Sequence, residues 1–146
     1  MTMSCVTANF EFFCDQFEVD APEDGQPSPG RQGRALGEWV RAGLAPDGPP
    51  LVGGRDGWRL DFPREHFRLW VGVGLTTDLR QRPQAPQPLA WRCSVCADVS
   101  FRSWFFWHRL LGVCSPEDDV LALAVRLGDR LRSNPRISEL ERWDHH

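Results

Sequence analysis

The sequence predicts an α+β fold, with a mainly antiparallel sheet of five to six strands and two main helices packed on one face. Two observations lead to this prediction. Several segments alternate apolar and polar residues with a period of two, and two others space their apolar residues as one stripe of a helix. Their order along the chain is β-α-β-β-β-β-α-β. Because 146 residues suit one hydrophobic core, we expect residues 1–146 to form a single domain.

The first strand is predicted from Asn9 to Val19, a segment dense in Phe. Its alternation slips between Phe12 and Phe13, which predicts a β-bulge or a change of register at that point. The segment 20–33 mixes Pro and Gly with acidic residues and Ser. Such a composition is typical of a flexible surface loop.

The first helix is predicted from Gln32 to Leu44, because its apolar residues have helical spacing and an Ala-Pro-Asp-Gly segment follows it. Residues 51–62 predict a tight hairpin, since a Gly-rich turn at 53–57 separates two short apolar runs. The second strand of this hairpin places three apolar side chains on one face: Trp58, Leu60 and Phe62.

The clearest alternation lies in two segments, 67–75 and 91–99, which we expect to be strands with one core face each. The core faces consist of Phe67, Leu69, Val71, Val73 and Leu75, and of Trp91, Cys93, Val95, Ala97 and Val99. The opposite faces hold Arg68, Trp70, Gly72 and Gly74, and Arg92, Ser94, Cys96 and Asp98. Three Pro residues between the two strands predict a flexible loop at 80–88.

The second main helix is predicted to start after Ser115. Ser115 suits the N-cap, Pro116 suits the first helical position, and an acidic residue follows three positions after the cap. The Asn-Pro pair at 134–135 ends the helix. Its expected buried stripe is Val120, Leu123, Ala124, Leu127, Gly128 and Leu131. A short helix is expected before it at 101–113, and a short strand after it at 137–143.

The composition narrows the classes of function. The formal net charge is −3, and all seventeen basic residues are Arg without a basic block, so we expect no nucleic-acid partner. The first twenty residues lack the pattern of a secretory signal, and no apolar run is long enough to cross a membrane. We therefore expect a cytoplasmic protein with no membrane partner. Five Cys residues are then expected to be reduced thiols.

One group of residues could form a zinc site. Cys93 and Cys96, with His108 and Cys114 further along the chain, have tolerable spacing for a tetrahedral zinc ion. Against this, residues three apart in a strand point to opposite faces and cannot converge on one ion. The interpretation as a zinc-dependent or cysteine-dependent enzyme or regulator using these four residues is therefore kept only as the alternative.

Catalytic pairs can also be drawn, but none has a sequence signature. A Cys-His nucleophile pair would combine Cys14 or Cys114 with His66 or His108. The spacing does not show that any such pair meets. We therefore predict no catalytic residue, no metal and no cofactor, and expect a protein that is not an enzyme.

Seven Trp residues are more than one small core readily hides, which indicates either a binding surface or a surface that a second helix covers. Trp beside Arg is the composition of interface hot spots, and the acidic loop at 20–33 offers a second surface. The predicted partner-binding residues are Asp20, Glu23, Asp24, Arg68, Trp70, Arg102, Trp104 and Trp107. Formation of a homodimer through the apolar segment 104–111 is a compatible expectation.

Four short features resemble a loose group of small bacterial proteins, some of which are immunity proteins that neutralise toxins delivered between cells. They are Gly57-Trp58-Arg59-Leu60 with the strand at 67–73, the strand that Trp91 begins, the segment LRSNPRI at 131–137, and Trp143. The resemblance implies a cytosolic, mildly acidic protein without catalytic residues, whose partner is a cognate toxin. The expected function is therefore protein binding.

Overall fold

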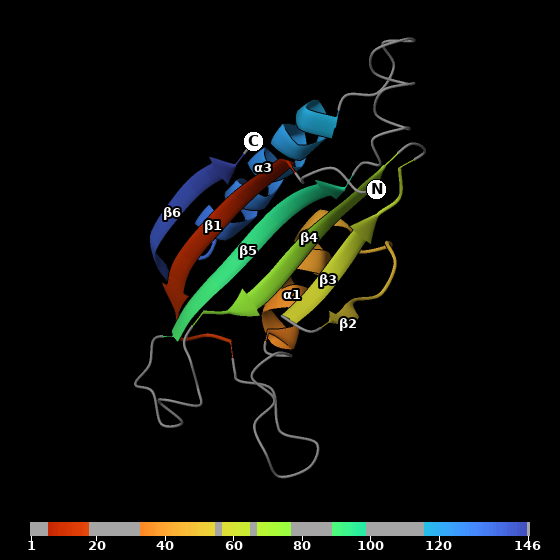
Figure 1. Cartoon of the computed structure of the whole chain (residues 1–146). Coiled ribbons are helices and arrows are strands. Elements are labelled where there is room, and N and C mark those ends of the chain that lie inside the picture. Colours follow the sequence, from red (N-terminus) through yellow and green to blue (C-terminus); the bar gives the residue numbers. More distant parts are fainter. Residues whose placement is uncertain are drawn as a thin grey trace.

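The computed structural model describes residues 6–17, 33–54, 57–64, 67–76, 89–98 and 116–145. The elements within them follow the predicted order (Figure 1). They are β1 (Val6–Cys14), α1 (Arg34–Leu44), β2 (Val52–Gly54), β3 (Gly57–Phe62), β4 (Arg68–Leu75), β5 (Leu89–Asp98), α3 (Pro116–Arg132) and β6 (Ile137–His145).

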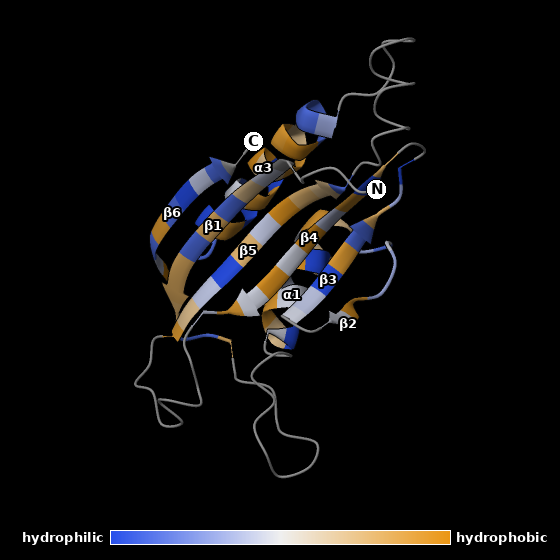
Figure 2. Ribbon diagram, in the orientation of Figure 1, coloured by the Kyte–Doolittle hydropathy of each residue, from blue (hydrophilic) through white to orange (hydrophobic). Residues whose placement is uncertain are grey.

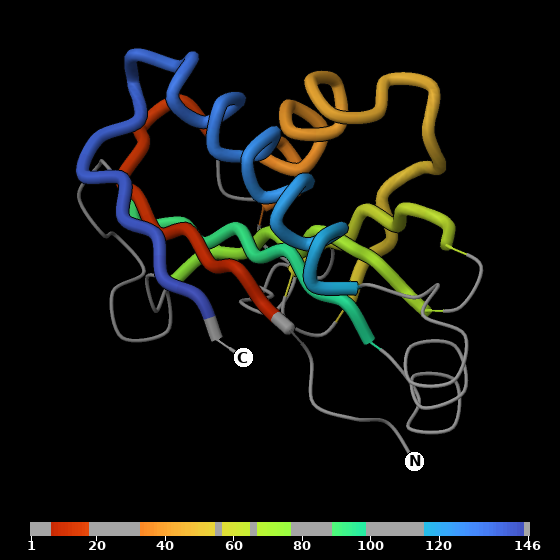
Figure 3. The backbone as a smooth tube through the Cα atoms, turned by 90° about the horizontal axis from the view of Figure 1, so that it is seen from above, coloured from red at the N-terminus to blue at the C-terminus, as the bar shows by residue number. Residues whose placement is uncertain are grey.

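The strands form one antiparallel sheet of six strands in the order β2-β3-β4-β5-β1-β6. Helix α1 packs against β3 and β4, and α3 packs against β1 and β5. Both helices lie on the same side of the sheet (Figure 3). The predicted α+β fold, with two helices on one face, is confirmed. Neither of these two helices is long and apolar enough to cross a lipid bilayer.

The core lies between the sheet and the helices. The predicted core faces of the two central strands are confirmed within the described residues, and Val99 lies outside them. The alternation of apolar and polar residues along β4 and β5 is visible in Figure 2. Each large apolar side chain that is fully buried stabilises the fold by about 1.5–3 kcal/mol. Helix α3 buries Pro116 in its first turn and all the residues of the predicted stripe: Val120, Leu123, Ala124, Leu127, Gly128 and Leu131.

Strand β1 differs from the prediction in its end and in its pattern. It ends at Cys14 and not at Val19. Its alternation does not slip, because Phe10 and Phe12 are buried in the core and Phe13 lies on the other face, 37% exposed. Phe12 and Phe13 therefore lie on opposite faces of a regular strand.

The expected change of register is confirmed, but the extra residue lies in β6. The pairing of β1 with β6 shifts between Glu11 and Phe13. Two steps along β1 there match three steps along β6, from Ser138 to Glu141. Glu139 takes up the difference with a φ of 53°, as in a β-bulge. Strand β6 is also longer than the short strand that the sequence predicts.

Two arginines of α3 bind backbone carbonyl groups of α1. Nη2 of Arg126 donates a hydrogen bond of 2.6 Å to the carbonyl oxygen of Leu44 at the end of α1, where helix carbonyls lack partners within the helix. Nε and Nη2 of Arg130 donate to the carbonyl oxygen of Trp39, at 3.3 and 2.9 Å. The Arg130 guanidinium also lies 4.1 Å from the centre of the Trp39 ring, within the range of a cation–π interaction.

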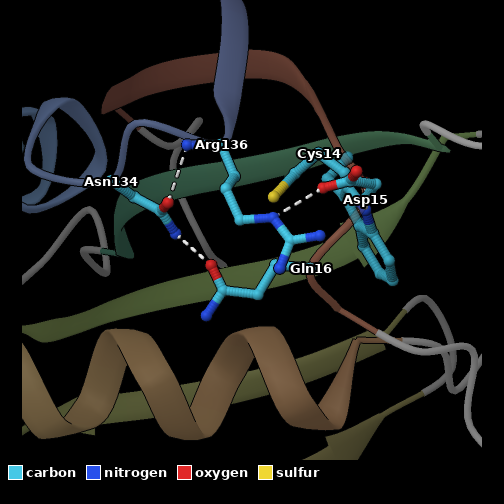
Figure 4. A network of polar contacts seen from close by, with 6 residues as sticks. Cys14, Asp15, Gln16, Asn134 and Arg136 are labelled. Carbon is cyan, nitrogen blue, oxygen red and sulfur yellow. Dashed lines mark hydrogen bonds and ion pairs between the residues drawn. The ribbon is translucent and has the colours of Figure 1, made fainter.

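A polar network joins the end of β1 to the turn between α3 and β6 (Figure 4). Nδ2 of the buried Asn134 donates to Oε1 of Gln16 at 2.6 Å, and its Oδ1 accepts from the backbone N–H of Arg136 at 2.9 Å. Nε of Arg136 donates to Oδ1 of Asp15 at 2.9 Å, and this hydrogen bond raises the pKa of Arg136. The buried amide thus has a partner for both its donor and its acceptor, as burial requires.

Several predicted segments lie outside the described residues. They are the loops at 20–33 (apart from Gly33) and 80–88, the short helix at 101–113 and the N-cap Ser115.

We expect Arg130→Ala to lower the free energy of unfolding by about 2 kcal/mol, because it removes charged hydrogen bonds to α1 and a cation–π contact. Arg132→Ala on the same helix is the matched control. Arg132 is 62% exposed, and its Nη1 lies 3.6 Å from Oδ1 of Asp129, so we expect a change of about 0.5 kcal/mol or less. Urea unfolding followed by circular dichroism measures both values, and equal losses would contradict the role given to Arg130.

Candidate functional site

The candidate site lies on the face of the sheet opposite the two helices. On this face β4 presents Arg68, Trp70, Gly72 and Gly74, and β5 presents Arg92, Ser94, Cys96 and Asp98, as the alternation predicts. In the part of the chain that the structure describes, no helix covers this face (Figure 3). The face therefore presents side chains that the core does not use.

One row of paired residues crosses the middle of this face. Arg59 on β3 pairs with Gly72, which pairs with Ser94, which pairs with Asn9 on β1, which pairs with Trp143 on β6. Small side chains occupy the centre of the row and large ones its two ends. The result is an open groove of about 770 Å³ with Gly72, Gly74, Ser94 and Asn9 among its lining.

Trp70 lies along the floor of the groove in a fixed position. Its indole lies over Gly72, where an added Cβ would come 2.8 Å from Cζ3 of the indole. Nε1 of the indole donates a 3.0 Å hydrogen bond to Oδ2 of Asp98. Because Gly72 has no side chain, the ring can lie flat on its own strand and is half-buried there.

Two arginines line the groove on either side of β4. Nη2 of Arg92 donates a 2.7 Å hydrogen bond to Oε1 of Glu11, and its guanidinium lies 5.6 Å from the centre of the Trp143 ring. Nε of Arg59 lies 3.1 Å from Oδ1 of Asp61. This Nε is buried, and its N–H does not point at an acceptor. We therefore describe the Arg59–Asp61 contact as an ion pair without an aligned hydrogen bond.

The polar residues in the centre of the groove bind one another. Oγ of Ser94 donates to Oδ1 of Asn9 at 2.7 Å, and Nδ2 of Asn9 lies 3.4 Å from Oγ1 of Thr7. The second contact is long for a hydrogen bond. The Asn9 amide N–H groups are therefore weakly satisfied.

The two cysteines of β5 point to opposite faces of the sheet, as the strand pattern predicts. Cys93 is fully buried in the core, whereas Cys96 lines the groove on the other face. They cannot bind one ion together. Among the side chains that the structure describes, no group of three or more His, Cys, Asp or Glu could hold a metal ion. The other members of the predicted zinc set, His108 and Cys114, lie outside the described residues.

Burial opposes reactivity at two of the thiols. Burial raises the pKa of the Cys93 thiol far above its ordinary value. It also raises the pKa of Cys14, although the backbone N–H of Gln16 partly offsets this shift. A nucleophilic cysteine needs the opposite shift, and the candidate partner His66 lies outside the described residues.

Two of the predicted partner-binding residues, Arg68 and Trp70, lie on the face that carries the groove. Trp70 lines the groove, and Arg68 is exposed beside it, with no ion-pair partner within the described ranges. The other predicted residues, which lie outside the described part of the chain, are Asp20, Glu23, Asp24, Arg102, Trp104 and Trp107.

Five residues in and around the groove were not predicted as site residues: Arg59, Arg92, Ser94, Asn9 and Trp143. The alternation of apolar and polar residues places Arg92 and Ser94 on the polar face of their strand, and this pattern could have identified them as site residues. Asn9 and Trp143 join them only through the pairing of β1 with β5 and β6. That pairing brings together residues from distant parts of the chain.

Comparison with known protein families, characterised proteins and solved structures gives no match to this chain.

The buried thiols predict that the free energy of unfolding falls as the pH rises above about 9. The chain has no Lys and no Tyr, and Arg does not titrate below about pH 12, so thiols are the side chains that lose protons from about pH 9 to pH 11. The pKa of Cys93 is raised on folding, so its contribution to stability is complete below its ordinary pKa of 9.0. Above that value stability falls, by about 1.4 kcal/mol per pH unit.

We expect Cys93→Ala to make this alkaline slope smaller by that amount. The core variant Leu60→Ala is the control, because it removes a buried apolar side chain without removing a titrating group. It should lower stability equally at every pH. Urea unfolding across this pH range measures the slopes, and an unchanged slope in Cys93→Ala would show that Cys93 is not shielded in the folded chain.

Proposed function

We propose that this protein is a protein-binding domain that receives its partner in the groove on the face of the sheet opposite α1 and α3. The observation that supports this proposal best is the juxtaposition of Trp70, Arg59 and Arg92 around a floor of small residues. Trp and Arg dominate the centres of protein interfaces, where they fill pockets and exclude water. Small residues between them leave room for a side chain of the partner.

The shape of the groove favours a protein partner over a small molecule. Sites for small molecules are usually enclosed and bury most of the ligand surface. This groove is instead an open depression that extends over β2, β3, β4, β5 and β1. A protein segment that lies across several strands would fill the whole length of the groove.

The side chains of the groove are held before a partner arrives. The Asp98 hydrogen bond fixes the indole of Trp70, Glu11 holds Arg92, and Asn9 holds Ser94. Side chains that are already ordered lose little entropy on binding, which favours affinity.

A narrower form of the proposal follows from the sequence resemblance: the domain is an immunity-type protein and its partner is a bacterial toxin. The mild net negative charge of −3 is compatible with this form. The alternative of a zinc-dependent or cysteine-dependent enzyme has less support, because Cys93 and Cys96 lie on opposite faces and the buried Cys93 thiol is held protonated.

The test uses the purified product of the gene adjacent to this one, with affinity measured by isothermal titration calorimetry. We expect Trp70→Ala to weaken binding about tenfold or more, because it removes the central aromatic side chain. Arg92→Gln, which keeps the Trp70 indole in place, should also weaken binding. Leu121→Ala is the control, since Leu121 is exposed on α3, and it should leave the affinity unchanged.

Two results would contradict the proposal in different ways. If the product of the adjacent gene does not bind the unaltered protein, the toxin-neutralising form fails. If it binds and the groove variants bind as tightly as Leu121→Ala, the groove is not the docking surface. Circular dichroism of each variant establishes that it is folded.

A further inference from the structure

We infer that the segment of the partner that enters the groove carries one or two carboxylate groups, which bind Arg59 and Arg92. This inference rests on the proposed function and specifies the chemistry of the partner. Three features of the groove support it: the sign of the charges in its lining, the unused donors of the two guanidinium groups, and the position of the neighbouring acidic residues.

The charged residues among the described lining of the groove are Arg59 and Arg92, and no carboxylate is among them. The two arginines come from β3 and β5, which lie on either side of β4. Neighbouring strands are about 4.8 Å apart, so the two backbones are separated by about 10 Å. Between them β4 contributes Gly72, over which the Trp70 indole lies, and Gly74, which adds no side chain to the space between the two arginines.

Both guanidinium groups have hydrogen-bond donors to spare. A guanidinium has five N–H donors, and Arg92 uses Nη2 toward Glu11 and is 50% exposed. Nε of Arg59 lies 3.1 Å from Oδ1 of Asp61 without an aligned hydrogen bond. The terminal nitrogens of Arg59 can thus bind a carboxylate through two parallel hydrogen bonds, the geometry in which Arg binds this group best.

The acidic residues around the groove favour a protein segment over a nucleic acid. Asp61, Asp98, Glu11 and Glu141 lie on the same face, outside the lining of the groove. A chain with a charge at every unit would lie against these carboxylates and be repelled. A peptide segment can instead place one or two carboxylates at the arginines and neutral residues elsewhere.

The first measurement uses two fluorescein-labelled peptides, one with two glutamates in a background of Gly and Ser and one with glutamines in their place. We expect the unaltered protein to bind the glutamate peptide about tenfold more tightly by fluorescence anisotropy, as befits charge-assisted hydrogen bonds. A single-stranded oligonucleotide with the same label is the third probe and should bind more weakly than the glutamate peptide.

Substitutions with opposite expected effects test the assignment to these arginines. Arg59→Gln and Arg92→Gln should each weaken binding of the glutamate peptide about tenfold. Glu11→Gln should strengthen it about threefold, because it removes a negative charge beside Arg92 while the amide oxygen can still accept the Arg92 hydrogen bond. Arg132→Gln and Asp129→Asn change the net charge by the same amounts on α3, on the far side of the sheet, and should have no effect.

The outcomes separate this inference from the proposed function. Equal binding of the two peptides, or an effect of the α3 controls as large as that of the groove variants, would overturn the carboxylate assignment. Tighter binding of the oligonucleotide would overturn the choice of a protein segment. If only the carboxylate inference fails, Trp70→Ala still weakens binding of the whole partner protein. If the proposed function fails, Trp70→Ala leaves the affinity for that partner unchanged.

Discussion

The alternation of side chains along β4 and β5 is the constraint on which the rest of the described structure depends. These strands lie side by side in the middle of the sheet, and every second residue of each is apolar and buried. A shift of either strand by one residue would turn Trp91 toward water and Ser94 toward the helices. The position of α1 and α3, and the groove on the other face, are therefore two results of one pattern.

Arg is the permanently cationic side chain on both sides of the sheet, since the chain has no Lys. On the helical side, the forked guanidinium groups of Arg126 and Arg130 reach carbonyl oxygens of α1, and the side chain of Arg130 lies over Gly43. On the other side, Arg59 contacts Asp61, and Arg92 contacts Glu11 and the ring of Trp143. A lysine ammonium would be a poor substitute in both places, because it lacks a planar array of donors.

The elements of the fold were predictable because their signals are local. The stripe of α3 and the two faces of β4 and β5 follow from residues two to four positions apart, and the structure confirms them. The groove was only partly predictable. Trp70 was identified from its own strand, but the row that joins Arg59 to Asn9 depends on the order of strands, which local spacing does not contain. Glu139 gave no signal, because its unusual φ comes from pairing with β1.

The bulge in β6 also bears on how copies of this protein meet. In the described sheet β6 and β2 are the outermost strands, and such strands offer unpaired backbone groups to any other extended chain. The bulge at Glu139 interrupts the regular spacing of these groups, and Glu141, Arg142 and Asp144 set charges along the same strand. At the opposite side β2 is three residues long. Edge-to-edge pairing between copies of this protein, the first step toward a fibril, is thus discouraged at both edges of the described sheet.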